Sequence, residues 1–514
     1  MIKLSGLKLN INASESDLVD LALKKAKMSR RDLKYFKLER KSLDARDKNN
    51  IFYSCTVTLS NKEQPKIERV YPKVNGGSVL VVGAGPAGLF CALDLLRYGF
   101  KVTLVERGLP VDEREKEYEK YLSTRILNTD CNIQFGEGGA GAFSDGKLNT
   151  QVGGELVKEV LLDFVSFGAP CEIEYISKPH IGSDNLKNVV KNMRLEIIRL
   201  GGKVLFSTKL TDLTISGGKV SAVYLNGEKQ EFSEVVLAVG HSARDVYEVL
   251  NIRGVMMESK DFAVGVRIEH LQSDINLAQY GEKYAYNKNM PVADYKLTSN
   301  VNGRGVFTFC MCPGGYVMPS QSNKNTVVVN GMSNYLRNGE NANSAIICQV
   351  FKKDFGEGLF DGVNYQKRLE ESAFTLGGEN YSAPVSLLGD FLKGENSTSF
   401  GKVKPTYALG VKKADLNKVL GENLSTSIKL GVLEMGKKIK GFDSYDAVLT
   451  AVESRTSSPV RVLRNEKLQS VSATNLYPCG EGCGYAGGIT SAGADGKRVA
   501  KQLAIKYGAQ FERN

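Results

Sequence analysis

The segment between residues 78 and 108 constrains the fold most strongly. It reads SVLVVGAGPAGLFCALDLLRYGFKVTLVERG, an apolar run, a glycine-rich turn, an amphipathic stretch and a second apolar run. This order, compressed into about thirty residues, predicts a βαβ unit with two parallel strands. Gly83, Gly85 and Gly88 have the spacing that permits a tight turn, lets a diphosphate approach the backbone and lets the helix pack closely on the strand.

The residues around this turn indicate a dinucleotide. Pro86 and Ala87 fit a first helical turn, whose free amides and positive dipole end attract phosphate. Glu106, with Arg107 beside it, ends the second strand 23 positions after Gly83, where a carboxylate accepts ribose hydroxyls. An acid at this position disfavours the 2′-phosphate of NADP.

Two later segments favour FAD over NAD. Four short strands are expected after Gly201, and the last, VVLAV, ends at Gly240 and is apolar enough for a buried parallel sheet. The second segment is YPCGEGCGYAGGITSAGADG. Both resemble segments of glutathione-reductase-like flavoproteins, and the resemblance implies that backbone amides of Gly487, Gly488 and Ile489 face the flavin. Where those flavoproteins often carry Gly-Asp, this chain has Gly480 and Glu481.

The chain as a whole resembles a family of uncharacterised FAD-dependent dehydrogenases with a small N-terminal α/β domain and a distinctive C-terminal substrate domain. The matching segments are RKSLDAR, GAGPAGL, NIQFGEGGAGAFSDGKLNT, LAVGHSARD, FCMCPGGYV, ESRTSSPVR and GEGCGYAGGITSAGADG. The resemblance implies an FAD oxidoreductase fold and leaves the substrate unassigned.

The predicted fold is α/β and has three parts. Residues 1–75 form a small basic α/β domain, and residues 76–254 form the first part of a Rossmann-like FAD domain with a β-meander crossover. Residues 255–465 form an inserted, mostly β substrate domain, and residues 466–514 return to the FAD domain. We expect the substrate pocket between the FAD domain and the inserted domain.

Candidate catalytic residues are few. The glycine loop FGEGGAGAFSDGK is expected near the cofactor through Gly138 and Gly139, with Lys147 or Ser144 near flavin N5. The alternative is a loop around the diphosphate with Lys147 exposed. Of three histidines, His270 is the best candidate for a general acid or base, although a purely structural histidine is the competing interpretation.

His241 is expected near the adenosine end of the cofactor, and no neighbouring motif suggests a role for His180.

Two pairs of cysteines and several arginines are further candidates for the active site. Cys310 and Cys312 are expected on one strand face, as a dithiol relay or as core packing, and Cys479 and Cys483 flank the flavin-proximal turn. A disulfide across one residue would be strained.

Three arginines are candidates for holding an anionic substrate or the cofactor: Arg455, Arg461, which has Glu453 nearby, and Arg267. The alternative is that these arginines form ion pairs at the surface. No cluster has metal-ligand spacing supported by histidine, so no metal is expected.

Composition and charge limit the possible location and function of the protein. Nine cysteines without a secreted pattern favour a reducing compartment, and the N-terminus lacks a signal peptide, so a cytoplasmic location without membrane attachment is expected. Residues 1–75 hold 17 Lys and Arg against 9 Asp and Glu, most of the formal net charge of +11. This basic domain raises the alternative of a nucleic-acid-associated flavoprotein, although it lacks an aromatic stacking motif.

The predicted function is hydride transfer between a small organic substrate and flavin N5. Because only one nucleotide fingerprint is present, NAD(P)H would bind only transiently, or another electron carrier would serve. A non-catalytic FAD-binding redox sensor is the remaining alternative.

Overall fold

The computed structural model describes residues 1–65, 69–150 and 153–511. Its N-terminal unit is a three-stranded antiparallel sheet covered by one helix, with elements β1 (Ile2–Asn10), α1 (Glu15–Ala26), β2 (Tyr35–Asp44) and β3 (Phe52–Ser60). Ser14 caps α1 by accepting from the Asp17 amide, while the Asp17 carboxylate accepts from the Ser14 amide. Leucines of α1 pack on alternate residues of the sheet, such as Leu7 and Val57.

A five-stranded parallel sheet forms the second unit. Its order is β22-β10-β4-β5-β6, with β4 (Ser78–Val82) between β10 (Glu234–Leu237) and β5 (Lys101–Val105). The outer strands are β6 (Lys203–Leu205) and β22 (Leu476–Pro478), the latter from the end of the chain. The apolar runs that predicted buried strands are thus placed side by side, and the α/β class with a Rossmann-like parallel sheet is confirmed.

Helices cover this sheet, and a meander extends from it. The helices are α2 (Pro86–Tyr98), α3 (Val111–Thr124), α4 (Glu155–Ser166), α5 (Ser183–Arg199), α6 (Arg244–Ile252) and α13 (Ile489–Lys506), with two 3-10 turns, η1 (Gly139–Phe143) and η2 (Cys171–Glu174). The meander is β7 (Leu210–Ser216), β8 (Lys219–Leu225) and β9 (Glu228–Gln230). The stretch after Gly201 therefore holds five strands rather than four, because β6 and β10 join the parallel sheet and three strands form the meander.

A buried charge cluster joins three of these helices. Lys497 of α13 is fully buried and lies 3.0 Å from the carboxylate of Asp94 in α2 and 2.7 Å from that of Asp163 in α4. Burial opposes the charge on Lys497, yet Asp94 and Asp163 raise its pKa above the ordinary value. Because a buried charge is tolerated only when it is paired, this cluster fixes how α2 and α13 lie against each other.

The third unit is a seven-stranded sheet of order β13-β14-β17-β12-β20-β18-β19, antiparallel except for its last pair. Its strands are β12 (Phe262–Leu271), β13 (Thr298–Val301), β14 (Arg304–Cys312), β17 (Asn341–Val350), β18 (Ala383–Leu387), β19 (Val411–Lys413) and β20 (Val448–Glu453). A hairpin of β15 (Tyr316–Pro319) and β16 (Val329–Met332) accompanies it. The pair β11 (Met257–Ser259) and β21 (Val460–Val462) lies where the chain enters and leaves this region.

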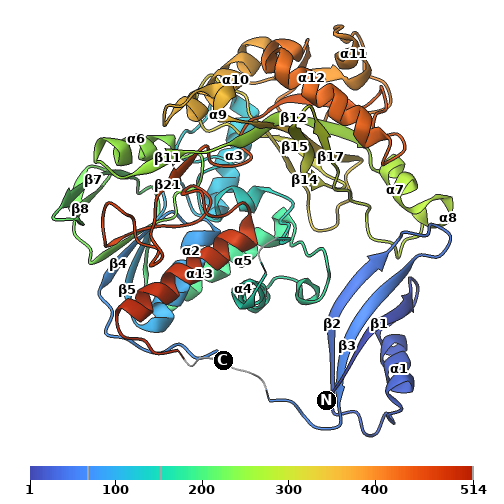
Figure 1. Cartoon of the computed structure of the whole chain (residues 1–514), viewed down its shortest axis with the longest axis horizontal. Helices are drawn as coiled ribbons and strands as arrows, with labels where there is room; N and C mark the ends of the chain where they lie inside the picture. Colours follow the sequence, from blue (N-terminus) through green and yellow to red (C-terminus); the bar gives the residue numbers. More distant parts are fainter. Residues whose placement is uncertain (66–68, 151–152, 512–514) are drawn as a thin grey trace.

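A helical layer covers the seven-stranded sheet, so the inserted region contains more helix than the sequence indicated. The long helices α10 (Asp361–Gly377) and α12 (Asn417–Gly436) lie above the sheet (Figure 1). Gly431 of α12 has no room for a Cβ, which would lie 2.5 Å from a methyl carbon of Val306. The remaining helices of this region are α7 (Gln272–Tyr280), α8 (Glu282–Ala285), α9 (Lys352–Phe355) and α11 (Leu388–Lys393).

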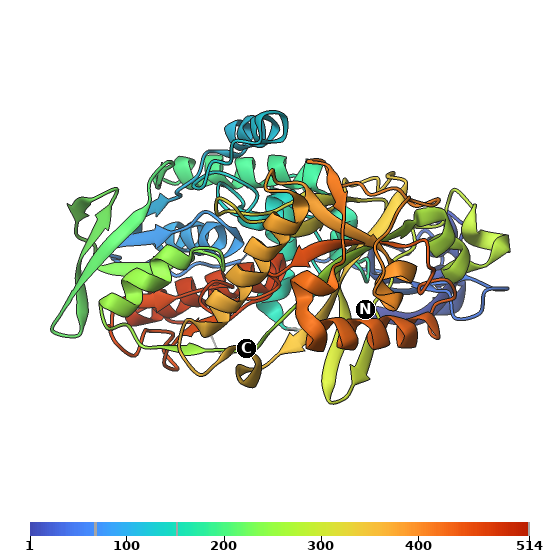
Figure 2. The same ribbon diagram turned by 90° about the horizontal axis from the view of Figure 1, so that it is seen from above.

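The N-terminal unit contacts both larger units through polar groups. Arg40 donates to the Ser177 hydroxyl at 3.1 Å, and Lys48 donates to the Ala278 carbonyl at 2.7 Å. Seen from above, the β7–β8 meander projects at one end of the molecule, and α8 lies with the N-terminal unit at the other (Figure 2). The exact domain limits stay a prediction. No helix among the described residues is long and apolar enough to cross a membrane.

The tight backbone contact within the βαβ unit gives a stability prediction. A Cβ at Gly88 would lie 1.8 Å from the carbonyl oxygen of Gly83, so Gly88→Ala forces α2 away from β4. We expect the free energy of unfolding to fall by about 2 kcal/mol, as for other overpacked sites. Urea denaturation followed by circular dichroism measures the change. Gly153→Ala is the matched control, because a Cβ there meets no atom within 4 Å; equal stability of the two variants would contradict the packing argument.

Candidate functional site

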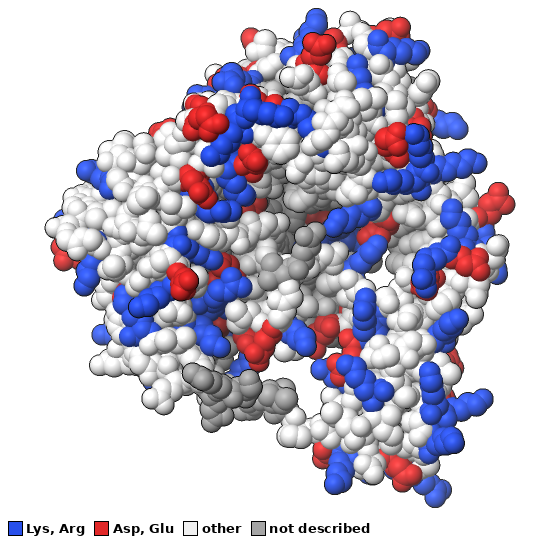
Figure 3. Space-filling view, viewed as in Figure 1, with Lys and Arg blue, Asp and Glu red and all other residues white. Residues whose placement is uncertain are grey.

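One cavity of about 460 Å³, in the size range of ligand pockets, lies between the parallel sheet and the seven-stranded sheet. The space-filling view is hollowed near its centre, between these two halves of the molecule (Figure 3). One wall consists of the ends of β4, β5 and β10 and the first turns of α2 and α13. The other wall comes from β14, β16 and β20. Residues that are far apart in the sequence thus meet around a single space.

The first turn of α2 presents bare amides to this cavity. Gly85 is the N-cap and has no side chain to satisfy them, and Pro86 occupies the first helical position. A Cβ at Gly85 would point into open space, since the nearest atom is the Cα of Gly139 at 3.9 Å. By contrast, Gly83 has φ of +105° and lies against the Ala238 carbonyl. The cradle therefore has the form and polarity that a diphosphate requires.

Glu106 lies at the end of β5 and organises the surrounding loops. One of its carboxylate oxygens accepts from the Ala84 amide at 2.8 Å, and the other accepts from Gly108 at 3.0 Å and Gly136 at 2.9 Å. The side chain is nearly buried, yet it still lines the cavity. Each carboxylate oxygen has two lone pairs, so acceptor capacity is left on this carboxylate for hydroxyls of a ligand.

The glycine loop packs directly onto this turn. The Gly138 amide donates to the Ala84 carbonyl at 2.8 Å, and a Cβ at Gly139 would lie 3.2 Å from the Cα of Gly85. Arg114 of α3, fully buried, holds the loop by donating to the carbonyls of Asn132, Ile133, Glu137 and Gly139. Burial lowers the pKa of Arg114 to about 10. No sequence signal pointed to Arg114, because nothing distinguishes it from the other charges of its polar helix.

A second bare helix end belongs to α13. Gly488 is its N-cap, without a side-chain partner, and added Cβ atoms at Gly487 and Gly488 would meet no atom within 4 Å. The turn just before it touches α2, because a Cβ at Gly480 would lie 2.7 Å from that of Ala87. The Gly480 amide donates to the Asp495 carboxylate at 2.9 Å. Two helix N-termini therefore point into the same space.

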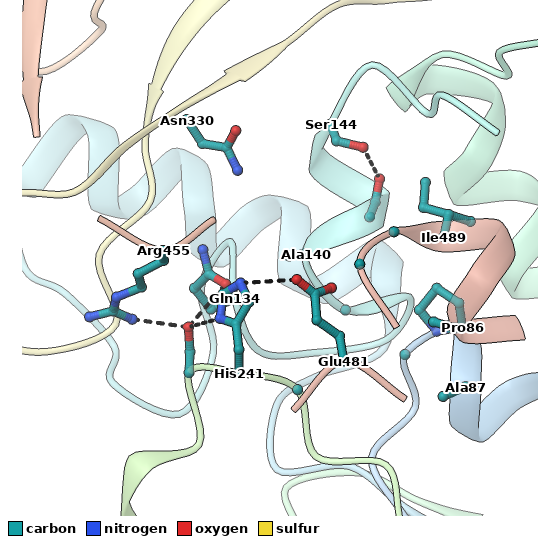
Figure 4. A pocket seen from close by; sticks show the side chains of 18 of the residues that line it. Pro86, Ala87, Gln134, Ala140, Ser144, His241, Asn330, Arg455, Glu481 and Ile489 are labelled. Carbon is teal, nitrogen blue, oxygen red and sulfur yellow. Dashed lines mark hydrogen bonds and ion pairs between the residues drawn. The ribbon is translucent and has the colours of Figure 1, made fainter. Parts of the chain in front are cut away.

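Glu481 and His241 lie between these helix ends and the opposite wall (Figure 4). The Nε2 atom of His241 is 3.8 Å from a Glu481 carboxylate oxygen. Burial, and then the charges of Arg455 and Arg244, lower the pKa of His241 to about 3, so its ring is neutral. Burial raises the pKa of Glu481 to about 7, although 28% of its side chain is accessible from the cavity.

A hydrogen-bond network fixes Arg455 at the cavity (Figure 4). Its guanidinium donates to the Ser242 hydroxyl at 3.1 Å and to the buried Glu370 carboxylate at 2.9 Å. Ser242 in turn donates to the Gln134 side-chain carbonyl at 3.1 Å. Burial opposes the charge on Glu370, but Arg244 and Arg455 hold its pKa well below the ordinary value. Arg455 is thus a fixed cation at the cavity wall rather than a free surface charge.

A second buried ion pair supports the seven-stranded wall. Arg267 is fully buried in β12 and lies 3.0 Å from a carboxylate oxygen of Glu453, which reaches the cavity. Gly331 of β16 allows the hairpin to approach, because a Cβ there would lie 1.9 Å from the Arg267 guanidinium. Burial raises the pKa of Glu453 above the ordinary value. Arg267 therefore stands behind the wall and does not reach the cavity itself.

Most residues expected at the cofactor line the cavity: Gly83, Gly85, Pro86, Ala87, Glu106, Arg107, Gly139, Gly240, Glu481, Gly487, Gly488 and Ile489. Three glycines lie just behind it and have packing roles: Gly88, Gly138 and Gly480. Arg107 is held in place by Asp245 at 3.0 Å and stacks on Phe135. Their assignment to particular groups of a cofactor stays a prediction.

The structure places some of the candidate catalytic residues at the cavity and others away from it. Lys147 and Ser144 line the cavity. His270 does not, and the expectation that it acts as a general acid or base needs correction. Its ring is buried against Phe442, with Nε2 2.8 Å from the Phe442 carbonyl, so it is a core histidine.

The structure also shows where Arg461, the C-terminal cysteines and His180 lie. Arg461 is partly exposed and pairs with Glu258 at 2.9 Å, which corrects the idea that it holds a substrate. Cys479 and Cys483 are fully buried outside the cavity lining, and burial raises the pKa of both thiols, that of Cys483 to about 12. His180 stacks on Tyr335 away from the cavity lining. Among the described residues, no group of His, Cys, Asp and Glu has an arrangement that could hold a metal ion.

Comparisons with known families agree with this architecture. Residues 77–283 match the pyridine nucleotide-disulphide oxidoreductase family, and residues 261–456 match the family described as "FAD-dependent protein, C-terminal domain-like". Residues 1–60 match a domain of unknown function. An uncharacterised protein of Clostridium beijerinckii is 43% identical over 528 residues, covering 98% of this chain and 99% of that protein.

Two solved structures illustrate the more distant likeness. The L-proline dehydrogenase of P. horikoshii has 12% identity and a TM-score of 0.33, with 85% of this chain and 94% of that chain covered. The flavin-dependent brominase Bmp2 has 12% identity and a TM-score of 0.38, with 85% of this chain and 80% of that chain covered. Likeness at this level supports no inference about activity or substrate.

The open space beside Gly85 generates a binding prediction. In Gly85→Leu the new side chain has room within the fold and fills the diphosphate cradle. We expect a well-folded protein with at least tenfold weaker FAD retention, measured by the flavin absorbance that remains after gel filtration. Gly153→Leu is the control, because a Cβ at Gly153 meets no atom within 4 Å and Gly153 is not among the residues that line the cavity. Full FAD occupancy in Gly85→Leu would refute the cradle.

Glu481 generates a pH prediction. Its pKa in the folded protein is raised to about 7, so it becomes ionised as the pH rises through neutrality. An ionised carboxylate opposes an anionic ligand, and FAD affinity should therefore fall between pH 6 and pH 8, by roughly tenfold at most. Quenching of flavin fluorescence measures the affinity. Glu481→Gln should remove the pH step, and an unchanged step in this variant would assign it to another group.

Proposed function

We propose that this chain, which belongs with the Clostridium beijerinckii protein to a family of uncharacterised FAD-dependent oxidoreductases, transfers a hydride between an organic substrate and flavin N5. The protein is an FAD-dependent oxidoreductase, and the reacting substrate is the part that we infer. One observation carries the proposal: two uncapped helix N-termini and a buried carboxylate line the same cavity as polar residues of a separate sheet.

The parallel-sheet wall holds the cofactor in this proposal. The amides at the start of α2 bind the diphosphate, with Gly85 and Gly139 leaving it room. Glu106 accepts ribose hydroxyls through the lone pairs that its backbone donors leave free. The turn at Gly487, Gly488 and Ile489 faces the flavin ring in this proposal. The Gly487 amide donates to the Ser491 hydroxyl at 3.2 Å, so the Gly488 and Ile489 amides are the candidate donors to the ring. Bound at this wall, FAD supplies a two-electron acceptor for a hydride.

Charge near the ring end is the second contribution of the chain. Lys147 and the uncapped end of α13 line the cavity and would stabilise negative charge that develops on the ring. The helix end is fixed before the reaction, since it is anchored to α2 through the Gly480 turn. Dipoles placed in advance cost no reorganisation when charge develops.

The opposite wall orients the substrate. Its cavity-lining groups include Asn330 and Arg455, which offer an amide and a cation. The five N–H groups of the Arg455 guanidinium all donate within the protein, so Arg455 would favour an acidic substrate through its fixed charge rather than through a direct hydrogen bond. His241 is neutral at physiological pH and borders the same space, where it could accept or donate one hydrogen bond.

Anaerobic reduction tests the proposal. Purified protein loaded with FAD is mixed with pools of small organic acids, amines and alcohols and, separately, with NADH and NADPH. Loss of the flavin absorbance near 450 nm is expected with one class of compound, and the effect should saturate with concentration. Arg455→Lys keeps the positive charge but loses the planar guanidinium group, and it should raise KM more than it lowers kcat. A flavin that only dithionite reduces would refute the proposal.

A further inference from the structure

The three-stranded sheet of the N-terminal unit has a helix on only one of its faces. Leu7 and Val57 lie on the face that packs against α1 and are buried there. In residues 1–60, all of which the structure describes, α1 is the single helix, so the other face has no helix of this unit on it. Because side chains alternate along a strand, Ser54 and Thr56 of β3 lie on that other face, which we call the open face.

Cations flank the hydroxyls of β3 on the open face. Lys3 of β1 and Lys37 of β2 both pair in register with Thr58, so they stand on opposite sides of β3. Lys8 of β1 and Arg40 of β2 lie on the same face, further along the sheet. All four basic side chains are exposed, and none forms an ion pair with a carboxylate among the described residues.

Carboxylates are fewer on this side of the unit. Asp44, at the end of β2, is held by Arg46 at 2.5 Å, and Glu39 occupies the bulge of β2. Glu15 and Asp17 belong to α1, across the core from the open face. The space-filling view likewise shows Lys and Arg gathered over the N-terminal unit, at the lower right of the picture (Figure 3). Positive charge therefore dominates this surface, which favours a partner that carries many negative charges.

The geometry of the sheet favours a single polyanionic strand. Neighbouring strands lie roughly 4.8 Å apart, so the backbones that carry Lys3 and Lys37 are separated by about 10 Å, with β3 between them. The floor between these lysines consists of small hydroxyl side chains, those of Ser54, Thr56 and Thr58. One sugar–phosphate chain can lie on this floor with cations within reach of its phosphates on both sides.

RNA suits this floor better than an acidic peptide. β3 is hydrogen-bonded to a neighbouring strand on each side, so its peptide groups are already used within the sheet. A peptide therefore cannot bind the open face by adding a strand, and would bind only through its side chains. RNA presents one phosphate per nucleotide to the cations and a ribose 2′-hydroxyl to the serine and threonine hydroxyls, and DNA lacks that 2′-hydroxyl.

The open face lies next to the rim of the flavin cavity. Arg40 donates to the Ser177 hydroxyl at 3.1 Å. The Lys41 amide donates to the Tyr175 carbonyl at 2.7 Å, and the Ser177 amide donates to the Lys41 carbonyl at 3.0 Å. The next residue, Lys178, lines the cavity. These contacts hold β2 beside the entrance to the cavity.

We propose that the open face binds single-stranded RNA, with the phosphates at its four cations and the ribose hydroxyls at the serine and threonine side chains of β3. The cations of the open face do not line the flavin cavity, so RNA binding is independent of the hydride transfer proposed above. The N-terminal unit thus attaches the oxidoreductase to RNA.

The affinity for a labelled RNA tests the proposal with the full FAD-loaded protein. The probe is a fluorescein-labelled single-stranded RNA of mixed sequence, and fluorescence anisotropy measures its binding. With four phosphate contacts, each contributing about −0.7, a plot of log affinity against log salt concentration should have a slope of about −2.8. Raising the salt from about 50 mM to about 200 mM should therefore weaken binding roughly fiftyfold.

A double variant tests the surface itself. Lys3→Gln combined with Lys37→Gln removes two phosphate contacts, and should weaken binding by about tenfold at low salt and reduce the slope by about 1.4. Lys24→Gln combined with Lys25→Gln is the matched control, because it removes the same charge from α1, on the other side of the sheet. Its affinity should stay close to that of the wild-type protein. Equal weakening by the two double variants, or no binding of RNA at low salt, would overturn the proposal.

Competition separates RNA from other polyanions. Unlabelled DNA of the same sequence, and poly-glutamate of the same charge, should compete more weakly than unlabelled RNA, since neither carries the ribose 2′-hydroxyl. Equal or stronger competition by DNA or poly-glutamate would overturn the assignment of RNA as the partner.

Cross-linking gives a readout that requires no variant. A photoactivatable thiouridine in the RNA should mark peptides from β1, β2 and β3, whereas cross-links confined to the other two units would overturn the open face as the binding surface. FAD occupancy should be unchanged in both double variants. Failure of every organic donor to reduce the flavin would refute the proposed function, while the anisotropy and the cross-links would still decide on RNA binding.

Discussion

The carboxylate of Glu106 is the contact on which the cofactor wall depends. It accepts hydrogen bonds from three backbone amides, those of Ala84, Gly108 and Gly136, which belong to three different loops. A nearly buried carboxylate is stable only when its lone pairs are used, so these loops must converge on it. The turn after β4, the loop after β5 and the glycine loop consequently share one anchor. A sugar hydroxyl would bind to a group that is already fixed in place.

The two walls of the cavity differ in physical character. The parallel-sheet wall offers backbone amides and glycines, which suit a ligand common to many enzymes. The opposite wall offers side chains such as Arg455 and Cys310. The buried carboxylate of Glu370 holds the Arg455 guanidinium, and the buried guanidinium of Arg267 holds the backbone carbonyl of Cys310. Buried ion pairs contribute little net stability, yet losing one partner is costly. Their role here is to fix direction: each cavity-facing group is oriented by a charge that cannot move.

The sequence was most informative where local geometry alone decides the outcome. The spacing of Gly83, Gly85 and Gly88 predicted the turn, and the structure shows three different reasons for the three glycines: a left-handed φ, an open cradle and a close helix–strand contact. The resemblance of the last fifty or so residues to flavoproteins placed β22 and α13 beside the βαβ unit, as observed. Lys147 was chosen for its place in a glycine loop expected at the flavin, and His270 was chosen by residue type; only Lys147 lines the cavity.

By itself, therefore, the sequence determined the parallel sheet and the glycines at two helix ends, because short-range periodicity and backbone sterics govern those features. The resemblance of two later segments to flavoproteins indicated FAD. Only the tertiary structure decided that Arg114 holds the glycine loop, that His270 is a core residue and that Arg455 faces the cavity while Arg461 does not. It also decided that Cys310 and Cys312 are adjacent on a bulge, where strand alternation had predicted only a shared face. Burial and charge pairing are long-range properties, set by residues hundreds of positions apart that meet only after folding.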